Sequence, residues 1–217
     1  MIDRNYISKT GDIGGHSLLA DVSPLVLVRP LEKVLVEDAS GKRNVLRCTG
    51  RWQNGNVINA NGRLYETSIL ESAVKSIQGD IKARGVLGEY DHPPDAKIHL
   101  DRVSHIITKL WTQDNEVYGE LEVLEHLPYG QQLAGLLKSN VRVGISSRGV
   151  GDMESTYCEG REVMKVLPGY SFVTFDVVAE PSVHGSYLHL MESKQRQLNT
   201  RRELEKKFIS EFRNRYK

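Results

Sequence analysis

The chain is poor in cysteine and contains no long apolar run. Cys48 and Cys158 are the only cysteines among 217 residues, too few for a disulfide framework, and no CxxC pair indicates a zinc or redox motif. A reducing, intracellular setting is therefore expected. Residues 1–15 include no apolar stretch that would indicate a signal peptide. The longest apolar stretches, such as PLVLV at 24–28, are far too short to span a bilayer, so we expect no membrane association.

The chain also lacks an excess of either charge, but only when it is averaged over its whole length. It has 29 basic and 28 acidic residues, a formal net charge of +1, which indicates no nucleic-acid or membrane surface. Residues 193–217 contain nine basic and three acidic residues, so this segment carries +6 and residues 1–192 carry −5. Such a basic segment beside an acidic body is typical of an interaction segment.

Short strand patterns dominate the sequence up to about residue 190. Turn-rich EDASGKRN predicts a hairpin over 33–52, and a second hairpin is predicted over 105–124. The other expected elements are strands at 24–28, 141–146, 161–167 and 170–180 and helices at 67–78 and 128–139. This pattern favours a β-dominated α+β fold, a β-barrel or sandwich with helices outside it. In 193–217, apolar residues recur every four positions, which predicts a basic amphipathic helix.

The helix predicted over 67–78 has both a start signal and a buried face. Ser68 and Glu71, three residues apart, fit a capping box. The apolar positions form one stripe at helical spacing, which consists of Ile69, Leu70, Ala73, Val74 and Ile77. We therefore expect this helix to pack one side against the core.

His92 is the first candidate for chemistry, in GEYDHPP at 88–94. Pro93 and Pro94 restrict the backbone that follows it. A histidine at a rigid bend can keep one orientation, as a general base requires. A solvated histidine in a turn is the simpler alternative.

Two adjacent serines follow in VRVGISSRGVG at 141–151. If a strand ends near Ser146, one hydroxyl is presented at a strand-to-loop transition, and the N–H groups of Ser147, Arg148 and Gly149 are available to a developing oxyanion. The spacing differs from the GxSxG elbow of α/β-hydrolases. A plain turn is the alternative, because serine and glycine are common in turns. In a strand, the two serines would point to opposite sides.

Asp176 interrupts the apolar strand pattern of FDVVAEPS at 175–182. A carboxylate in such a strand needs a partner, and a histidine N–H is a suitable one. In a serine–histidine–aspartate triad, the acid orients the imidazole and stabilises its protonated form. A solvent-facing aspartate on an edge strand is the alternative.

A metal site is a further alternative that the histidines raise. His99 and His105 follow His92 at spacings of seven and six, which match no familiar ligand spacing. His105 lies in an expected strand and is interpreted as a structural side chain.

Five stretches carry a resemblance to a known family. They are NANGRLYETSILESAVKS (59–76), LGEYDHPP (87–94), DNEVYGELEVLE (114–125), VGISSRGVG (143–151) and FDVVAEPS (175–182). In content, order and separation they resemble the prohead core protein proteases of contractile-tailed, myovirus-type phages. The resemblance spans about residues 44–188.

The resemblance implies a serine endopeptidase with a fold similar to herpesvirus assemblin, a β-barrel ringed by helices. It implies Ser146 as nucleophile, His92 as general base and Asp176 as the acid. It also implies that the enzyme uses neither a cofactor nor a metal. Such enzymes act in the host cytoplasm inside the assembling prohead. Their substrates are scaffold or core proteins and the major capsid protein, and they also cleave themselves.

The family's cleavage preference, Leu or Ile, any residue, then Glu, points to a processing site. Six such tripeptides occur, at 35–37, 64–66, 69–71, 87–89, 190–192 and 209–211. Most lie in expected strands or helices, but 190–192 lies where the acidic body meets the basic segment. We therefore expect autocleavage after Glu192, and docking of the basic tail on an acidic scaffold before it.

The expected organisation is an N-terminal extension at 1–43, partly packed on a protease domain at 44–192, and a basic helical tail at 193–217. A non-catalytic capsid-assembly scaffold component with the same fold is the alternative function. A basic pocket is expected for the substrate glutamate, with four candidate side chains, Arg102, Arg142, Arg148 and Arg161.

Overall fold

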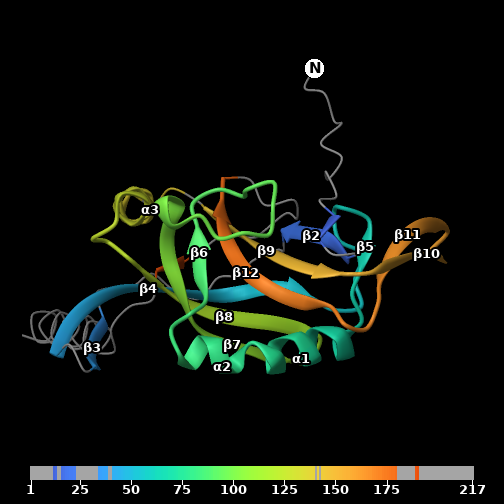
Figure 1. The fold of residues 1–217 in the computed structure, drawn as a ribbon, viewed down its shortest axis with the longest axis horizontal. Helices are drawn as coiled ribbons and strands as arrows, with labels where there is room; N and C mark the ends of the chain where they lie inside the picture. The colour runs from blue at the N-terminus through green and yellow to red at the C-terminus, as the bar shows by residue number, and fades with distance from the viewer. Residues whose placement is uncertain are drawn as a thin grey trace, which may run out of the picture.

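The computed structural model describes residues 12–13, 16–22, 34–38, 41–139, 141, 143–179 and 189–190. The expected strand at 24–28, Arg142, Glu192 and the expected tail helix lie outside these residues. Strands dominate the described part (Figure 1), and three α-helices and one 3-10 helix accompany them. The β-dominated α+β class is therefore confirmed.

The first sheet carries the serine motif. It is antiparallel, and its strand order is β1-β2-β9-β12. The strands are β1 (Asp12–Ile13), β2 (His16–Val22), β9 (Gly144–Gly151) and β12 (Ser171–Val178). Part of the segment expected to be an N-terminal extension thus forms the strand beside β9.

The second sheet is larger and contains both predicted hairpins. Its order is β13-β4-β8-β7-β6, and β3 pairs with β4 beside this path. The strands are β3 (Val34–Asp38), β4 (Gly41–Asn54), β6 (Leu87–Glu89), β7 (Val103–Gln113), β8 (Glu116–Val123) and β13 (His189–Leu190). The hairpins predicted over 33–52 and 105–124 are confirmed as β3–β4 and β7–β8.

A small third sheet extends to one side of the molecule. Strands β10 (Met153–Cys158) and β11 (Arg161–Val166) form a hairpin, and β11 pairs in parallel with the short β5 (Arg63–Leu64). Figure 1 shows this hairpin projecting at the right of the view.

The helices cover the second sheet. Helices α1 (Thr67–Ser76) and α2 (Gln78–Lys82) lie along β7 (Figure 1), α3 (Pro128–Lys138) packs on β7 and β8, and the 3-10 helix η1 (Leu100–Arg102) precedes β7. The predicted apolar stripe of α1 is confirmed, because all five of its members are buried.

The capping box predicted for α1 is wrong. The helix begins at Thr67, two residues earlier than that motif requires, and it has no side-chain cap from its N-cap residue Glu66. The Asn56 side chain accepts from the Thr67 N–H at 3.3 Å instead. A distant side chain on the loop after β4 therefore serves the first turn.

An aromatic cluster joins the two main sheets. The rings of Trp52 on β4 and Phe175 on β12 are both fully buried, with centroids 4.9 Å apart. Phe172 lies equally close to Phe175. Because side chains alternate along a strand, this inward position of Phe175 directs its neighbour Asp176 to the opposite face.

The expected closed barrel is not found among the described strands, which form three separate sheets. The first two sheets meet where the chain after β6 reaches β12, through an isolated parallel bridge between Tyr90 and Val177. Among the described residues, no helix is both long and apolar enough to span a membrane.

Candidate active site

The serine motif lies inside a central strand and not at its end. We expected a strand over 141–146 followed by a turn, but β9 runs from Gly144 to Gly151 between β2 and β12. The glycine at position 149 is required by packing, because a Cβ atom there would overlap the buried Tyr170 ring. Residues that are common in turns here allow an aromatic side chain to lie against the strand.

The two serines point to opposite sides of β9, as their alternation predicts. Ser147 Oγ donates to the carbonyl oxygen of Asp21 on β2, 2.9 Å away. Ser146 lies directly across the other ladder from Asp176, and side chains of directly opposed residues share a face. Ser146 is fully buried, and its Oγ has no hydrogen-bond partner within the described part of the chain.

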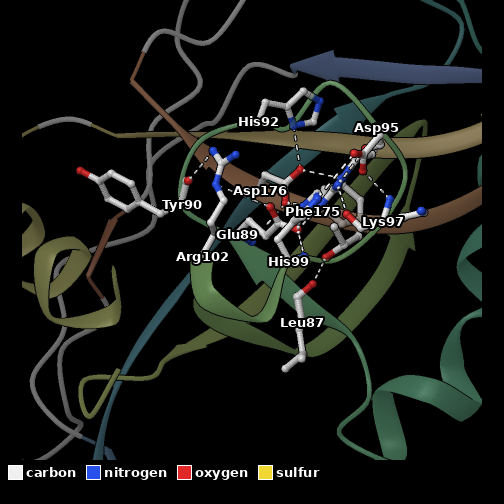
Figure 2. A network of polar contacts seen from close by, with 12 residues as sticks. Leu87, Glu89, Tyr90, His92, Asp95, Lys97, His99, Arg102, Phe175 and Asp176 are labelled. Carbon is white, nitrogen blue, oxygen red and sulfur yellow. Dashed lines mark hydrogen bonds and ion pairs between the residues drawn. The ribbon is translucent and has the colours of Figure 1, made fainter. Parts of the chain in front are cut away.

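His92 and Asp176 are brought together across 84 positions of sequence. His92 Nδ1 lies 2.7 Å from Asp176 Oδ2, and the dashed line in Figure 2 marks this contact. The carboxylate is fully buried, and the imidazole is 20% exposed. Because a carboxylate accepts and does not donate, Nδ1 carries the proton of this contact, and in a neutral imidazole Nε2 then has the free lone pair. His92 Nε2 is also buried with no partner among the described residues.

The loop that carries His92 is attached to β12 by its backbone. The Glu89 N–H donates to Asp176 Oδ1 at 3.1 Å, and the Asp91 N–H donates to the Val177 carbonyl at 2.8 Å. Asp91 has a φ of +69°, an uncommon conformation for a residue other than glycine. This turn and the prolines after His92 fix where the imidazole leaves the backbone.

Arg148 is a buried link between these groups. Its side chain is fully buried, and Nη2 donates to Asp176 Oδ1 at 3.0 Å and to Glu89 Oε1 at 3.2 Å. Its Nε lies 3.0 Å from Asp176 Oδ2, an ion-pair contact without hydrogen-bond alignment. Nη1 donates to the carbonyls of Asp95 and Lys97 at 2.9 and 2.8 Å. In Figure 2, the labelled Glu89, Asp95 and Lys97 lie around Asp176.

This geometry argues against the oxyanion or substrate-binding role expected for Ser147, Arg148 and Gly149. Each is paired with a residue of β2 on one side and of β12 on the other, so their backbone N–H groups lie within two ladders. The guanidinium of Arg148 is buried and already surrounded by oxygens of the chain, so it is not free to receive a substrate glutamate.

Arg102, another arginine expected to receive glutamate, contacts the chain just before His92. Its guanidinium donates to the Tyr90 carbonyl at 3.4 Å and lies 4.0 Å from Glu89, and its side chain is 31% exposed. Arg161 is exposed on the β10–β11 hairpin.

The three histidines do not share a metal-binding arrangement. His105 is fully buried on β7, where its ring nitrogens lie 2.9 Å from Ser104 Oγ and the Phe175 carbonyl. Burial lowers the pKa of His105 to about 4. His99 Nδ1 lies 3.5 Å from Glu89 and its Nε2 3.5 Å from Asp95. His105 is thus a structural residue, as its strand position indicated.

Sequence reasoning missed Glu89. It is fully buried, and besides Arg148 its Oε1 accepts from the His99 backbone N–H at 2.7 Å. The signal was present, because Glu89 ends the apolar pattern of β6 as Asp176 interrupts that of β12. A charged side chain in such a position requires partners.

A second buried polar cluster lies behind the serine strand. The Asp21 carboxylate accepts from Arg63 at 2.9 Å and Asn61 at 2.8 Å, and from the Tyr65 hydroxyl. Burial, and then the Asp21 charge, raises the pKa of Tyr65 well above its usual value. The cluster therefore links β2 to the segment 61–65, whereas the Ser147 bond links β2 to β9.

The tripeptides that match the cleavage preference differ in setting. Those at 35–37, 69–71 and 87–89 lie in β3, α1 and β6, and 64–66 runs from β5 to the residue before α1. Leu190 pairs with Cys48 of β4, whereas 191–192 and 209–211 lie outside the described residues.

Comparison with known proteins identifies the family of this chain. The family described as prohead core protein serine protease matches residues 12–197. The chain is 35% identical over 152 residues to the prohead core protein protease of Enterobacteria phage T4, a match that covers 68% of this chain and 70% of the relative. The structure of the bacteriophage T4 capsid assembly protease is similar, with a TM-score of 0.62, 32% identity, and coverage of 74% of this chain and 96% of that one. The chain therefore belongs to the family of prohead core protein serine proteases.

Proposed function

We propose that this protein is a serine endopeptidase that matures the phage prohead, with Ser146 as nucleophile, His92 as general base and Asp176 as the acid. The observation that carries the proposal is the 2.7 Å contact of His92 Nδ1 with Asp176 Oδ2, beside a serine that opposes Asp176 across the ladder. Ser146 Oγ and His92 Nε2 are both buried and unpaired among the described residues. Buried polar groups without a hydrogen-bond partner require an explanation. The roles of nucleophile for Ser146 and general base for His92 provide one.

The chemistry follows from these roles. His92 Nε2 takes the proton of Ser146 Oγ as the oxygen attacks the scissile carbonyl, and Asp176 stabilises the imidazolium that results. The imidazolium then returns its proton to the leaving amine, which breaks the peptide bond and leaves an acyl-enzyme for water to hydrolyse. Because Ser146 is fully buried in this form, neighbouring segments must move before a substrate reaches it.

The proposed substrates are the scaffold or core proteins and the major capsid protein, cleaved after Leu or Ile, any residue, then Glu, inside the assembling prohead in the host cytoplasm. The relatives named as prohead core and capsid assembly proteases support this setting. We further propose a fold related to herpesvirus assemblin, a protease domain over 44–192, self-cleavage after Glu192, and docking of the basic segment 193–217 on an acidic scaffold.

A peptide assay with active-site labelling tests the catalytic roles. A synthetic peptide of residues 185–197, which contains Leu-Met-Glu, is incubated with wild type, Ser146→Ala and His92→Ala, and the products are identified by mass. Cleavage after Glu192 by wild type alone supports the proposal. A fluorophosphonate should add its mass at Ser146 and stop cleavage, whereas a chelator should not. Chelator-sensitive cleavage would instead indicate a metal-dependent hydrolase.

Self-cleavage is tested by the intact mass of the purified protein over time. Wild type should lose the 193–217 segment while Ser146→Ala stays whole. Equal clipping of both proteins would identify a contaminating protease. If neither protein is cleaved and the peptide assay and labelling also fail, even with a prohead scaffold protein added, the chain is a non-catalytic assembly component.

A further inference from the structure

We infer that Arg148 is a positioning residue for the proposed triad, which holds the His92 loop and Asp176 together and favours the neutral, base-competent form of His92. This inference rests on the proposed function for its role in catalysis, but its geometry and its effect on protonation can be measured without catalysis. It differs from the substrate-binding role that the sequence suggested for this arginine.

The first support is that Arg148 and His92 share one carboxylate. Asp176 Oδ2 contacts both the imidazole Nδ1, at 2.7 Å, and the guanidinium Nε, at 3.0 Å. Oδ1 accepts from Nη2 of the same guanidinium and from the Glu89 N–H. Arg148 lies two residues from Ser146 on the same face of β9, so the strand that presents the serine also orients the acid.

The second support is that Arg148 binds the backbone of the loop that carries His92. Its Nη1 donates to the carbonyls of Asp95 and Lys97, three and five residues after His92. The other end of the loop is fixed where the Asp91 N–H donates to β12. The planar fork of arginine can make these contacts at once, whereas a lysine amine cannot match their geometry.

The third support is the balance of charge around the imidazole. Asp176 is the carboxylate in contact with His92, and Arg148, fully buried, is the cation on that carboxylate. Glu89 contacts the Arg148 guanidinium through Oε1 and lies near Arg102 through Oε2. His99, farther along the loop, lies between Glu89 and Asp95. The Arg148 charge opposes protonation of His92, and Glu89 offsets part of that charge.

Two neutral variants should therefore act in opposite directions. Arg148→Gln removes the positive charge and leaves Asp176 to favour the imidazolium, so the acid limb of the kcat/KM profile should move to higher pH by about one unit. Glu89→Gln keeps the size and an acceptor oxygen but removes a negative charge, so the limb should move to lower pH. Arg148→Lys keeps the charge but not the fork, so kcat should fall while the limb stays near that of wild type.

The experiment measures the His92 ring directly as well as activity. Histidines labelled with ¹³C are titrated by NMR in wild type and the three variants, with the His92 signal assigned from its loss in His92→Gln. The same proteins are assayed on the 185–197 peptide across pH. Arg84→Gln is the control, since it removes a partly exposed guanidinium that pairs with Glu122 away from the site. Circular dichroism and thermal melts check that each variant is folded.

The inference is supported if the midpoint of the His92 NMR titration moves to higher pH in Arg148→Gln and to lower pH in Glu89→Gln. It should not move in Arg84→Gln. Midpoints that stay at the wild-type value while activity falls would show that Arg148 only stabilises the fold, and this would overturn it. If Arg148→Gln does not fold, an unchanged midpoint in Glu89→Gln overturns it equally. If the midpoints shift but no protein cleaves the peptide, the positioning by Arg148 stands and the proposed function fails.

Discussion

Ser146 and Asp176 are direct partners across the β9–β12 ladder, so the proposed nucleophile and acid leave the same face of one sheet. Two adjacent strands hold them in register, and their separation does not depend on a flexible loop. Only His92 comes from a loop, and the chain on both sides of it is bonded to β12 or to Arg148. Rigid elements of this kind provide the preorganised geometry that catalysis needs.

The two adjacent serines should respond differently to removal of the hydroxyl. Ser146→Ala should abolish peptide cleavage, because it removes the nucleophile. Ser147→Ala should keep most activity and lower the free energy of unfolding by about 1 kcal/mol, since it loses the bond to Asp21 on the far side of β9. The kcat/KM values and urea denaturation of both variants check this. Equal loss of activity in the two variants would contradict the assignment of Ser146 alone as nucleophile.

Asp176→Asn should lower kcat by about 10³- to 10⁴-fold, because a neutral amide neither fixes the imidazole tautomer nor stabilises the imidazolium. The side chain keeps its size, so the protein should still bind peptide. Asp95→Asn is the matched control, since it removes a partly exposed carboxylate of the same loop that lies 3.5 Å from His99 and accepts from the Lys97 N–H at 2.8 Å. A loss in Asp95→Asn as large as in Asp176→Asn would mean that the effect is not specific to the proposed triad.

His92 and Asp176 could be singled out from the sequence, although nothing in it placed side chains 84 positions apart in contact. Asp176 interrupts an apolar strand and therefore needs a partner, and the family resemblance supplied the histidine. The role of Arg148 could not be predicted. An arginine after two serines is equally compatible with substrate binding, and only the register that opposes Ser146 to Asp176 places Arg148 against the acid.

The bounds of β9 could not be predicted from the sequence either. Glycines favour turns when only local propensity is considered, but here Tyr170 packs where a side chain on Gly149 would lie, which is a tertiary reason for that glycine. The predicted α1 stripe was correct because helical periodicity reports burial directly. The capping box failed because Asn56, distant in sequence, serves the helix start.

Asp21→Asn should destabilise the protein by about 3 kcal/mol or more, because it leaves the buried Arg63 guanidinium without its carboxylate. Urea denaturation measures this loss. Lys165→Gln is the control, since it breaks a solvent-accessible pair with Glu66 that should contribute little to stability. If Asp21→Asn is as stable as Lys165→Gln, the buried pair of Asp21 with Arg63 does not stabilise the protein.

His105 should make the protein less stable in mild acid. Burial lowers the pKa of His105 in the folded state from 6.5 to about 4, whereas the unfolded chain takes up this proton near pH 6.5. Between these two pH values the unfolded state binds more protons than the folded state. The unfolded state is therefore increasingly favoured over the folded state as the pH falls. The contribution of His105 to stability is therefore present above pH 6.5 and lost progressively towards pH 4, by roughly 3 kcal/mol.

The test compares wild type with His105→Gln in urea at several pH values from 7 to 4. The variant can still donate to the Phe175 carbonyl, which now lies 2.9 Å from His105 Nε2, but it has no proton to gain in this range. Its free energy of unfolding should fall less steeply with acidity than that of wild type, and His126→Gln, at an exposed ring, controls for the loss of a histidine. Equal slopes in wild type and His105→Gln would mean that other groups govern the acid sensitivity. A flatter slope would identify the imidazole beneath Asp176 as a source of acid lability that is separate from any effect of pH on His92.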